Sequence, residues 1–318
     1  MFPIVQSAKK RVLLIGSGGI GTITALNLEL SGECAVTAVL RSNYKAVKEN
    51  GFKIDAIDYG TIDSWRPTQV RNSVPDVVNN KEEEEYEYVV CTTKNTPDVP
   101  PPMVELIKPA VTPGRSVIVL IQNGINIEKP IVEAFPHNVV LSGISRMGAN
   151  ELRPGFILQD DQDRLGIAPF DNPNLAPTEC SYDGDFQLRL IAMNENYADA
   201  DPVALLVRPA MKEVIAVAKS AGITLEPELI DLIVEAEPVD SFCVPSMLQD
   251  ARKGRPMEVE NILGEVTRTA DKNQVPVPVI KVLYALLKAR QWRTIERNGM
   301  IDLQGDVEKR KKEEQSGK

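Results

Sequence analysis

The chain has 318 residues, 43% of them hydrophobic and 25% charged, which is typical of a globular protein with room for about two domains. Its formal net charge of −9 argues against nucleic-acid binding, and no apolar run reaches the about 18 residues of a membrane-spanning helix. A single histidine and four widely spaced cysteines disfavour histidine-dependent hydrolases, zinc sites and a disulfide framework. We therefore expect a reduced, cytoplasmic protein without a metal, in which protons move through lysine, tyrosine, a carboxylate or water.

The first half alternates short apolar runs with helix-like stretches, the pattern of β–α–β units around a parallel sheet. We predict strands at residues 12–15, 35–40, 88–93, 116–121 and 139–141, with helices at 20–30, 43–50, 103–107 and 127–134. We expect His137 in the loop before the last of these strands. This half, residues 1–179, is therefore predicted to be a Rossmann-type, doubly wound α/β domain that ends in a turn-rich linker.

The second half is predicted to be all-helical. Apolar residues recur at helical spacing over residues 203–221 and stop at Gly222, a favourable C-terminal cap. Further helices are expected at 227–235, 245–253, 257–273 and 279–295. We assign residues 180–302 to a helical substrate and dimerisation domain, and we expect residues 303–318 to form a charged, disordered tail.

The strongest motif is GSGGIG, which directly follows the first apolar run and opens the first amphipathic helix. Its three motif glycines are Gly16, Gly18 and Gly21, the G-x-G-x-x-G spacing of dinucleotide-binding folds. Such glycines permit a tight turn, a close approach of the backbone to a pyrophosphate, and close helix–strand packing. We predict that a cofactor pyrophosphate meets the backbone of Gly16, Ser17, Gly18, Gly19, Ile20 and Gly21.

The residue at the end of the second strand distinguishes NAD from NADP enzymes, because NAD enzymes usually carry an acidic residue there. Here Arg41 holds that place, with Ser42 and Asn43 beside it and Lys45 nearby. A guanidinium can bind a 2′-phosphate with two hydrogen bonds, which favours NADP(H) over NAD(H). The alternative is an ordinary surface arginine after a strand.

Two more loops follow predicted strands, at the edge where open α/β sheets bind ligands. One is TTKN, with Lys94, and the other is QNG, with Asn123. An isolated Asn-Gly pair can be a simple turn, but its position beside the nucleotide favours a role in the site.

Short-chain dehydrogenases use a Tyr-x-x-x-Lys pair, and the sequence contains that spacing twice. Tyr44 and Lys48 come too early in the chain, on the adenine side of the predicted nucleotide. Tyr284 and Lys288 lie in LYALLK, which we interpret as an ordinary apolar helix face with an i,i+4 pair. We interpret both pairs as coincidental.

Taken together, the motifs resemble the ketopantoate reductase (2-dehydropantoate 2-reductase) family over nearly the whole chain. The resemblance rests on GSGGIG, Arg41, TTKN, QNG, PGF at residues 154–156, VRPAMKEVIAVAKSAGI and, above all, PSMLQDARKGRPMEVENILGEV. It implies a Rossmann domain joined to a helical domain, with the active site in the cleft between them and a possible homodimer. It also implies hydride transfer from NADPH to a 2-keto acid, often ketopantoate, giving pantoate for pantothenate and coenzyme A.

The resemblance also implies roles for individual residues. Lys94 would face the cofactor ribose and the substrate, and Asn123 the nicotinamide ribose. Ser246 would hydrogen-bond the substrate, and Glu258 would orient it. The alternative for Ser246 is a helix N-cap, with Gln249 at capping-box spacing, and for Glu258 a solvated carboxylate in a first helical turn.

One part of the chain departs from the family pattern. The family carries a general-acid lysine, with an asparagine one turn later, at the start of its helical domain, but no lysine occurs here between Arg164 and Lys212. Arg189 and Asn194 are the nearest equivalents, and Cys243 stands where many members have asparagine. A segment within residues 181–203 is therefore expected to be missing or replaced. Ketopantoate reduction therefore has two alternatives: reduction of another carbonyl substrate, or a catalytically silent NADP(H)-binding protein.

Overall fold

The computed structural model describes residues 8–80, 82–175, 203–235 and 245–301. The chain divides into two compact units. The first contains Met1–Asn95, Met103–Asn123 and Ile127–Asp183, and the second contains Thr96–Pro102, Gly124–Asn126 and Gly184–Lys318. The predicted boundary at residue 179 and the predicted tail at 303–318 lie outside the described residues.

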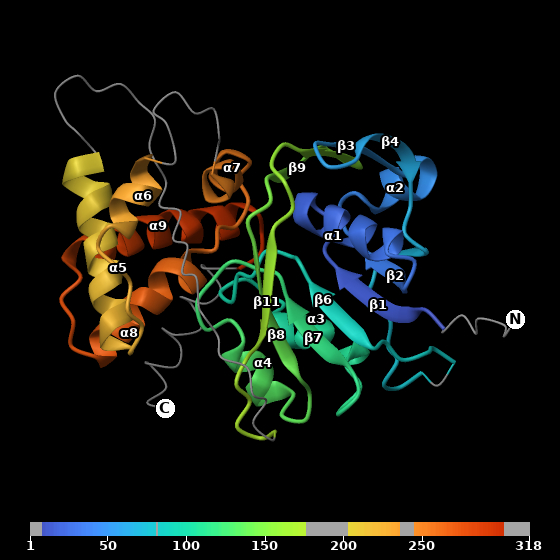
Figure 1. Ribbon diagram of the computed structural model, residues 1–318, viewed down its shortest axis with the longest axis horizontal. Helices are drawn as coiled ribbons and strands as arrows, with labels where there is room; N and C mark the ends of the chain where they lie inside the picture. Colours follow the sequence, from blue (N-terminus) through green and yellow to red (C-terminus); the bar gives the residue numbers. More distant parts are fainter. Residues whose placement is uncertain (1–7, 81, 176–202, 236–244, 302–318) are drawn as a thin grey trace, which may run out of the picture. The chain divides into compact units, whose positions relative to one another are not determined.

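The first unit is built on a seven-stranded sheet with the order β11-β8-β7-β6-β1-β2-β5. Six strands are parallel, and β11 runs antiparallel to β8. This order places the topological switch of a Rossmann-type sheet between β1 and β6. Both strands are labelled in Figure 1. The strands are β1 (Lys10–Ile15), β2 (Cys34–Val39), β5 (Gln69–Arg71), β6 (Tyr88–Cys91), β7 (Val117–Leu120), β8 (Val140–Ser145) and β11 (Leu165–Pro169).

Helices cover both faces of this sheet, because successive side chains of a strand point to opposite sides. Leu13 and Ile15 pack with residues of α3 (Met103–Ile107) and α4 (Lys129–Ala134), whereas Val12 and Leu14 pack with Ala25 of α1 (Gly19–Leu30). The short helix α2 (Tyr44–Asn50) follows β2, and a 3-10 turn (Lys108–Ala110) follows α3. The predicted doubly wound α/β class is therefore confirmed, and His137 lies exposed in the turn after α4, as predicted.

A second, four-stranded sheet with the order β4-β3-β10-β9 was not predicted from the sequence. Its strands are β3 (Phe52–Ala56), β4 (Gly60–Trp65), β9 (Ala149–Arg153) and β10 (Phe156–Gln159). Ile23 and Leu26 of α1 pack against Phe52, Ile54 and Ile157 of this sheet. The helix is thus covered on two sides, which explains why its middle turns are almost wholly buried.

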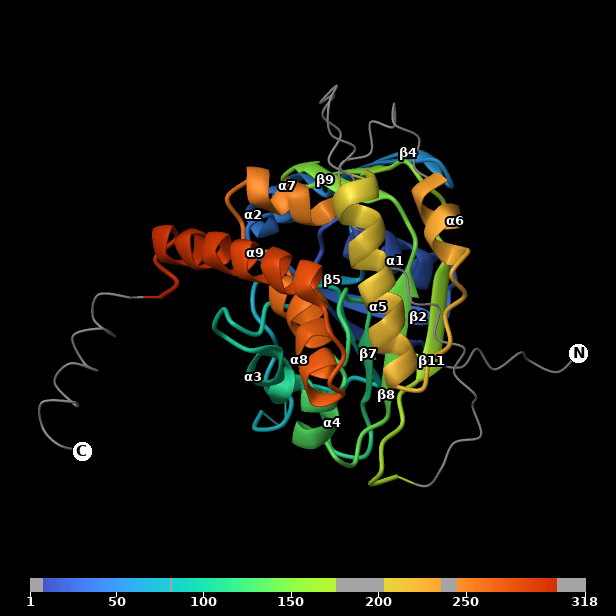
Figure 2. The same cartoon turned by 90° about the vertical axis from the view of Figure 1, so that its left-hand side faces the viewer.

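The second unit is helical, as predicted. Its core joins α5 (Arg208–Ser220), α8 (Glu265–Lys272) and α9 (Pro278–Arg297) through residues such as Val214, Val266 and Ile280, and Figure 2 shows these helices side by side. α5 ends before Gly222, whose φ of +85° gives the predicted C-terminal stop. The predicted helices at 203–221 and 257–273 begin with π-helical turns, Val203–Val207 and Glu260–Gly264. The remaining helices are α6 (Leu229–Glu235) and α7 (Ser246–Arg252).

None of the helices in the described part of the chain has the length and apolar composition that a bilayer crossing requires.

Candidate functional site

Three loops of the first unit meet at one edge of the main sheet. β1, β6 and β7 are neighbours, and Ile15, Cys91 and Leu120 lie in register at their carboxyl ends. The main-chain N–H of Thr92 donates to Ile15 O (3.0 Å), and the Thr92 hydroxyl donates to Gly16 O. The glycine-rich turn, TTKN and QNG therefore follow adjacent strands at the switch point, where this class of sheet binds ligands.

The four glycines of the turn have different environments. Gly16 has a φ of +100°, which favours glycine. A Cβ at Gly19 would lie 2.1 Å from Ala149 O, and one at Gly21 would lie 1.9 Å from Gly16 O. A Cβ at Gly18, in contrast, would meet nothing within 4 Å. Gly16, Gly19 and Gly21 therefore serve the turn and the packing of α1, whereas the backbone at Gly18 faces open space.

The start of α1 is suited to an anion. No side chain caps its N-terminus and no acidic residue lies in its first turn, so the first N–H groups of the helix keep their hydrogen-bonding capacity. Ser17 is only 5% exposed, and its hydroxyl has no hydrogen-bond partner among the described residues. The Asn43 amide donates to Ser17 O (2.8 Å) and to Glu151 Oε1 (2.8 Å), which fixes the turn. The side chain of Ile20 packs against the core, so Ile20 would contribute its main-chain N–H to a bound anion. Together these features fit a cofactor pyrophosphate.

Arg41 lies two residues beyond β2, the strand next to the glycine-rich turn. Its side chain is exposed, and none of the described acidic residues forms an ion pair with it. Lys45, on the first turn of α2, is also exposed. A solvated guanidinium at this position, with no carboxylate from the described residues bound to it, suits the 2′-phosphate of an NADP cofactor.

Lys94 and Asn123 both carry exposed side chains in the loops after β6 and β7. The sequence did not reveal the residue that joins these loops, Gln122. Its amide donates to Thr93 O (2.7 Å) and to the Thr93 hydroxyl (3.1 Å), and the Asn95 amide lies 3.4 Å from Gln122 Oε1. Hydrogen bonds between the loops therefore bring TTKN and QNG together, so QNG is more than an isolated turn.

In the second unit, both alternatives to a substrate role meet difficulties. Ser246 is exposed and is the first residue of α7; Pro245 holds the cap position, and no side chain caps the helix, so the capping-box interpretation is wrong. Glu258 is only 4% exposed, so the interpretation as a solvated carboxylate is also wrong. The substrate roles of Ser246 and Glu258 therefore stay predictions.

The interpretation of Tyr284 and Lys288 as part of an ordinary apolar helix face is wrong, because the hydroxyl and the ammonium group both form hydrogen bonds with acidic side chains. The Tyr284 hydroxyl donates to Glu260 Oε1 (2.7 Å), and the Lys288 ammonium donates to the same oxygen and to Asp98 Oδ2 (3.1 Å). Burial alone would raise the pKa of Glu260, but hydrogen bonds from Lys288, Arg268 and Tyr284 outweigh it and lower that pKa to about 2. Glu260 is therefore ionised at neutral pH. The sequence did not reveal this ion-pair network, because the residues that form it come from distant parts of the chain.

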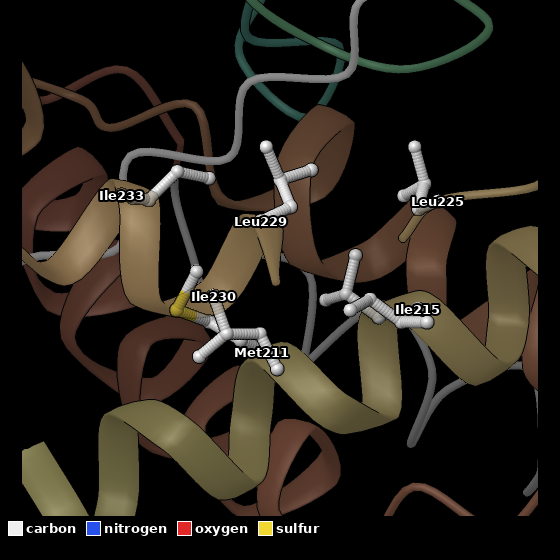
Figure 3. Close-up of a pocket in the computed structure, with 7 residues that line it drawn as sticks. Met211, Ile215, Leu225, Leu229, Ile230 and Ile233 are labelled. Carbon is white, nitrogen blue, oxygen red and sulfur yellow. The ribbon is translucent and has the colours of Figure 1, made fainter. Parts of the chain in front are cut away.

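An apolar cavity of about 20 Å³ lies between α5 and α6, lined by residues that include Met211, Ile215, Leu229 and Ile233 (Figure 3). Its volume is about that of a single water molecule, and an apolar lining offers such a water no hydrogen bonds. None of the predicted site residues lines it. We interpret it as imperfect packing between two helices rather than as a ligand site.

Comparison with known proteins decides the family. The model described as ketopantoate reductase PanE/ApbA matches residues 12–172, and the model of its C-terminal region matches residues 190–291. The chain belongs to the ketopantoate reductase family. It is thus a member of a family of NAD(P)-dependent oxidoreductases, as the motifs predicted.

Individual relatives agree with this assignment. The uncharacterized protein YDL144C of Saccharomyces cerevisiae is 33% identical over 345 residues, which cover 92% of this chain and 96% of that protein. The crystal structure of 2-dehydropantoate 2-reductase from Methylococcus capsulatus is 27% identical, has a TM-score of 0.69, and covers 89% of this chain and 97% of its own. D-mandelate dehydrogenase in a ternary structure with NADH and anilino(oxo)acetate shares the fold, with a TM-score of 0.69 at 18% identity over 90% of this chain and 99% of that chain.

This ketopantoate reductase family member is shorter than its yeast relative in the aligned region. The alignment runs over 345 residues, more than the 318 of the whole chain, so it includes yeast residues with no counterpart here. The expected loss of a segment within residues 181–203 stays a prediction. Arg189, Asn194 and Cys243, which the sequence analysis singled out there and nearby, lie outside the described residues.

Proposed function

We propose that this chain is an NADPH-dependent reductase that converts a 2-keto acid to a 2-hydroxy acid, with 2-dehydropantoate as its substrate and pantoate as its product. The observation that carries the proposal is the glycine-rich turn, which is open at Gly18 and lies next to the strand that leads to the exposed Arg41. Family membership supports the reaction class. The product would enter pantothenate and coenzyme A synthesis, in the cytoplasm.

In this proposal each part of the chain has a defined task. The N–H groups of the first turn of α1 bind the pyrophosphate, and Arg41 binds the 2′-phosphate. NADPH, when bound, supplies the hydride that the substrate carbonyl carbon receives. Lys94 and Asn123 contact the cofactor ribose and the reacting end of the substrate, and the positive charge of Lys94 stabilises the negative charge that develops on the carbonyl oxygen.

Ser246 and Glu258 are proposed to hold the substrate. The Ser246 hydroxyl donates to a substrate oxygen, and the Glu258 carboxylate accepts from a substrate hydroxyl, because an ionised carboxylate is an acceptor only. Reduction of the carbonyl also consumes one proton at oxygen. We assign that proton to water, since no lysine lies between Arg164 and Lys212. A positioned acid contributes roughly 10²–10⁴-fold in rate, so we expect slow turnover.

The proposed cofactor specificity depends on Arg41. We expect Arg41→Ala to weaken NADPH binding about 10- to 100-fold, because a hydrogen-bonded charge pair contributes about 1.5–3 kcal/mol. NADH has no 2′-phosphate, so its affinity should change by less than about twofold. Fluorescence titration of both coenzymes measures the effect, with Lys45→Ala as the neighbouring control. Equal losses for NADPH and NADH would contradict a phosphate contact.

The proposed reaction is tested by following NADPH oxidation with 2-dehydropantoate and a panel of other keto acids. Turnover of 2-dehydropantoate that falls when Glu258 is replaced by Gln supports the proposal. Turnover of a different carbonyl compound alone favours a reductase with another substrate. Saturable NADPH binding without turnover of any substrate favours a silent NADP(H)-binding protein.

A further inference from the structure

Gln291 of α9 holds the main chain immediately before Glu258. The Gln291 side chain is 0% exposed, and both ends of its amide form hydrogen bonds with the main chain of Met257. Its Oε1 accepts from Met257 N (2.8 Å), and its Nε2 donates to Met257 O (2.9 Å). Because the amide is buried and planar, these two hydrogen bonds fix the orientation of the Met257 main chain.

Lys288 and Tyr284, on the preceding turns of α9, hold the residue two positions after Glu258. Both donate to Glu260 Oε1, and Arg268 donates to Glu260 Oε2 (2.8 Å) and to Glu260 O (3.0 Å). The side chains of Glu260 and Lys288 are 11% and 23% exposed. Removing one partner of a shielded ion pair leaves the other charge uncompensated, so the place of the Glu260 carboxylate depends on these donors.

The two contacts come from one face of α9, since residues 284, 288 and 291 recur at spacings of four and three. They hold Met257 and Glu260, which lie on either side of Glu258 in the chain. The main chain of Glu258 is fixed as well, because its carbonyl accepts from Ile262 N (3.2 Å). The backbone that carries the Glu258 carboxylate is therefore held by a helix some thirty residues further along the chain.

We propose that Tyr284, Lys288 and Gln291, which we call the α9 clamp, are positioning residues that set the place of the Glu258 carboxylate for the substrate. This inference rests on the proposed function, in which Glu258 binds the keto acid. None of the three touches the reacting atoms in this proposal; they act through Glu258. Loss of the clamp is expected to impair substrate binding and leave cofactor binding intact.

Small displacements of a binding group have large effects, because a misplacement of about 1 Å can cost up to about 100-fold in rate. We expect Lys288→Met to raise the KM for the keto acid by at least about tenfold, while the Kd for NADPH changes by less than about twofold. Lys288→Arg keeps donors for Glu260 and Asp98 and should restore most of the substrate affinity. Lys281, also on α9, forms an exposed ion pair with Asp271 of α8. Lys281→Met removes that pair and should leave both constants unchanged.

A lower melting temperature in Lys288→Met without any change in KM would overturn the proposal, because it would show a purely structural role. A shift in KM for Lys281→Met as large as the shift for Lys288→Met would overturn it too. If Lys288→Met does not fold, Gln291→Leu replaces it. That change removes both hydrogen bonds to Met257 and the contact of Gln291 Nε2 with Asp98 Oδ1 (3.5 Å), and it places no charge in the buried site.

Hydrogen exchange of the wild-type protein and the variants gives a readout that does not depend on turnover. The Met257 amide reports the contact with Gln291, and the Ile262 amide reports the Glu258 carbonyl. We expect both amides to exchange at least about tenfold faster in Lys288→Met or Gln291→Leu than in Lys281→Met. Unchanged exchange would overturn the clamp whatever the activity. If the wild-type protein reduces no keto acid, the proposed function fails, and faster exchange at these two amides still supports the positioning role.

Discussion

Gly18→Asp is expected to fold normally and to lose NADPH binding by at least about 100-fold, because like charges placed against each other cost several kcal/mol. A Cβ at this position meets nothing within 4 Å, and the φ of −79° and ψ of −155° suit any residue. Aspartate is also a favoured N-cap, so the helix that follows should be at least as stable. The introduced carboxylate, however, would face the place where the pyrophosphate is expected. Calorimetric titration with NADPH measures the loss.

Gly166→Asp is the matched control for this variant. Gly166 lies in β11, also has no atom within 4 Å of a Cβ, and does not have a positive φ. Both variants add one negative charge to the protein. A lower NADPH affinity in Gly18→Asp than in Gly166→Asp would therefore come from the position of the charge at the turn. Full NADPH binding by Gly18→Asp would show that the cofactor does not approach this part of the backbone.

Gly21→Ala is expected to have the opposite outcome and to destabilise the first unit by about 3–5 kcal/mol, at the upper end of overpacking effects. Its Cβ would lie 1.9 Å from Gly16 O and 2.4 Å from the Thr92 hydroxyl oxygen. The closer atom belongs to the main chain of the turn, so no side-chain rotation relieves the clash. Either the first turn of α1 must move away from β1, or the turn itself must change shape.

Urea denaturation of the variant and the wild-type protein measures this loss of stability. Gly166→Ala serves as the control and should change the free energy of unfolding by less than about 0.5 kcal/mol. A Gly21→Ala protein with wild-type stability would contradict the close packing of α1 on the glycine-rich turn.

The contrast between Gly18 and Gly21 illustrates how far a motif can be interpreted from the sequence. The spacing G-x-G-x-x-G after an apolar run predicted the turn, the helix and the parallel sheet, since each depends on local pattern. The sequence also assigned close backbone approach to the middle glycine and helix packing to the last, and the open space at Gly18 and the tight packing at Gly21 agree with this. The close approach of Gly19 to Ala149 O was not predicted, because it joins residues 130 positions apart in the chain.

The second sheet shows why other parts of the fold escaped prediction. β4 is largely exposed along both faces, so its residues lack the apolar alternation that marks a half-buried strand. β3 does alternate, but it is only five residues long and pairs in parallel with β10, a hundred residues later. Strand pairing at such separation is decided by tertiary packing on α1, which local patterns do not contain.

The polar cluster of the second unit was missed for a related reason. Glu260, Lys288 and Asp98 form one ion-pair network, although 28 residues separate the first two and 190 separate the last two. In the sequence, each is an ordinary charged residue within or near a helix. The structure is needed to show that Lys288 forms an ion pair with Glu260 and that Tyr284 donates a hydrogen bond to the same carboxylate.

Calorimetric titration of the folded wild-type protein with NADPH and with NADH tests the central claim most directly. That claim is that the glycine-rich turn and Arg41 together bind a nicotinamide dinucleotide that carries a 2′-phosphate. We expect saturable, one-to-one binding of NADPH and at least about tenfold weaker binding of NADH, because a charge-assisted phosphate contact is lost. Absence of binding to both coenzymes by folded protein would contradict the account.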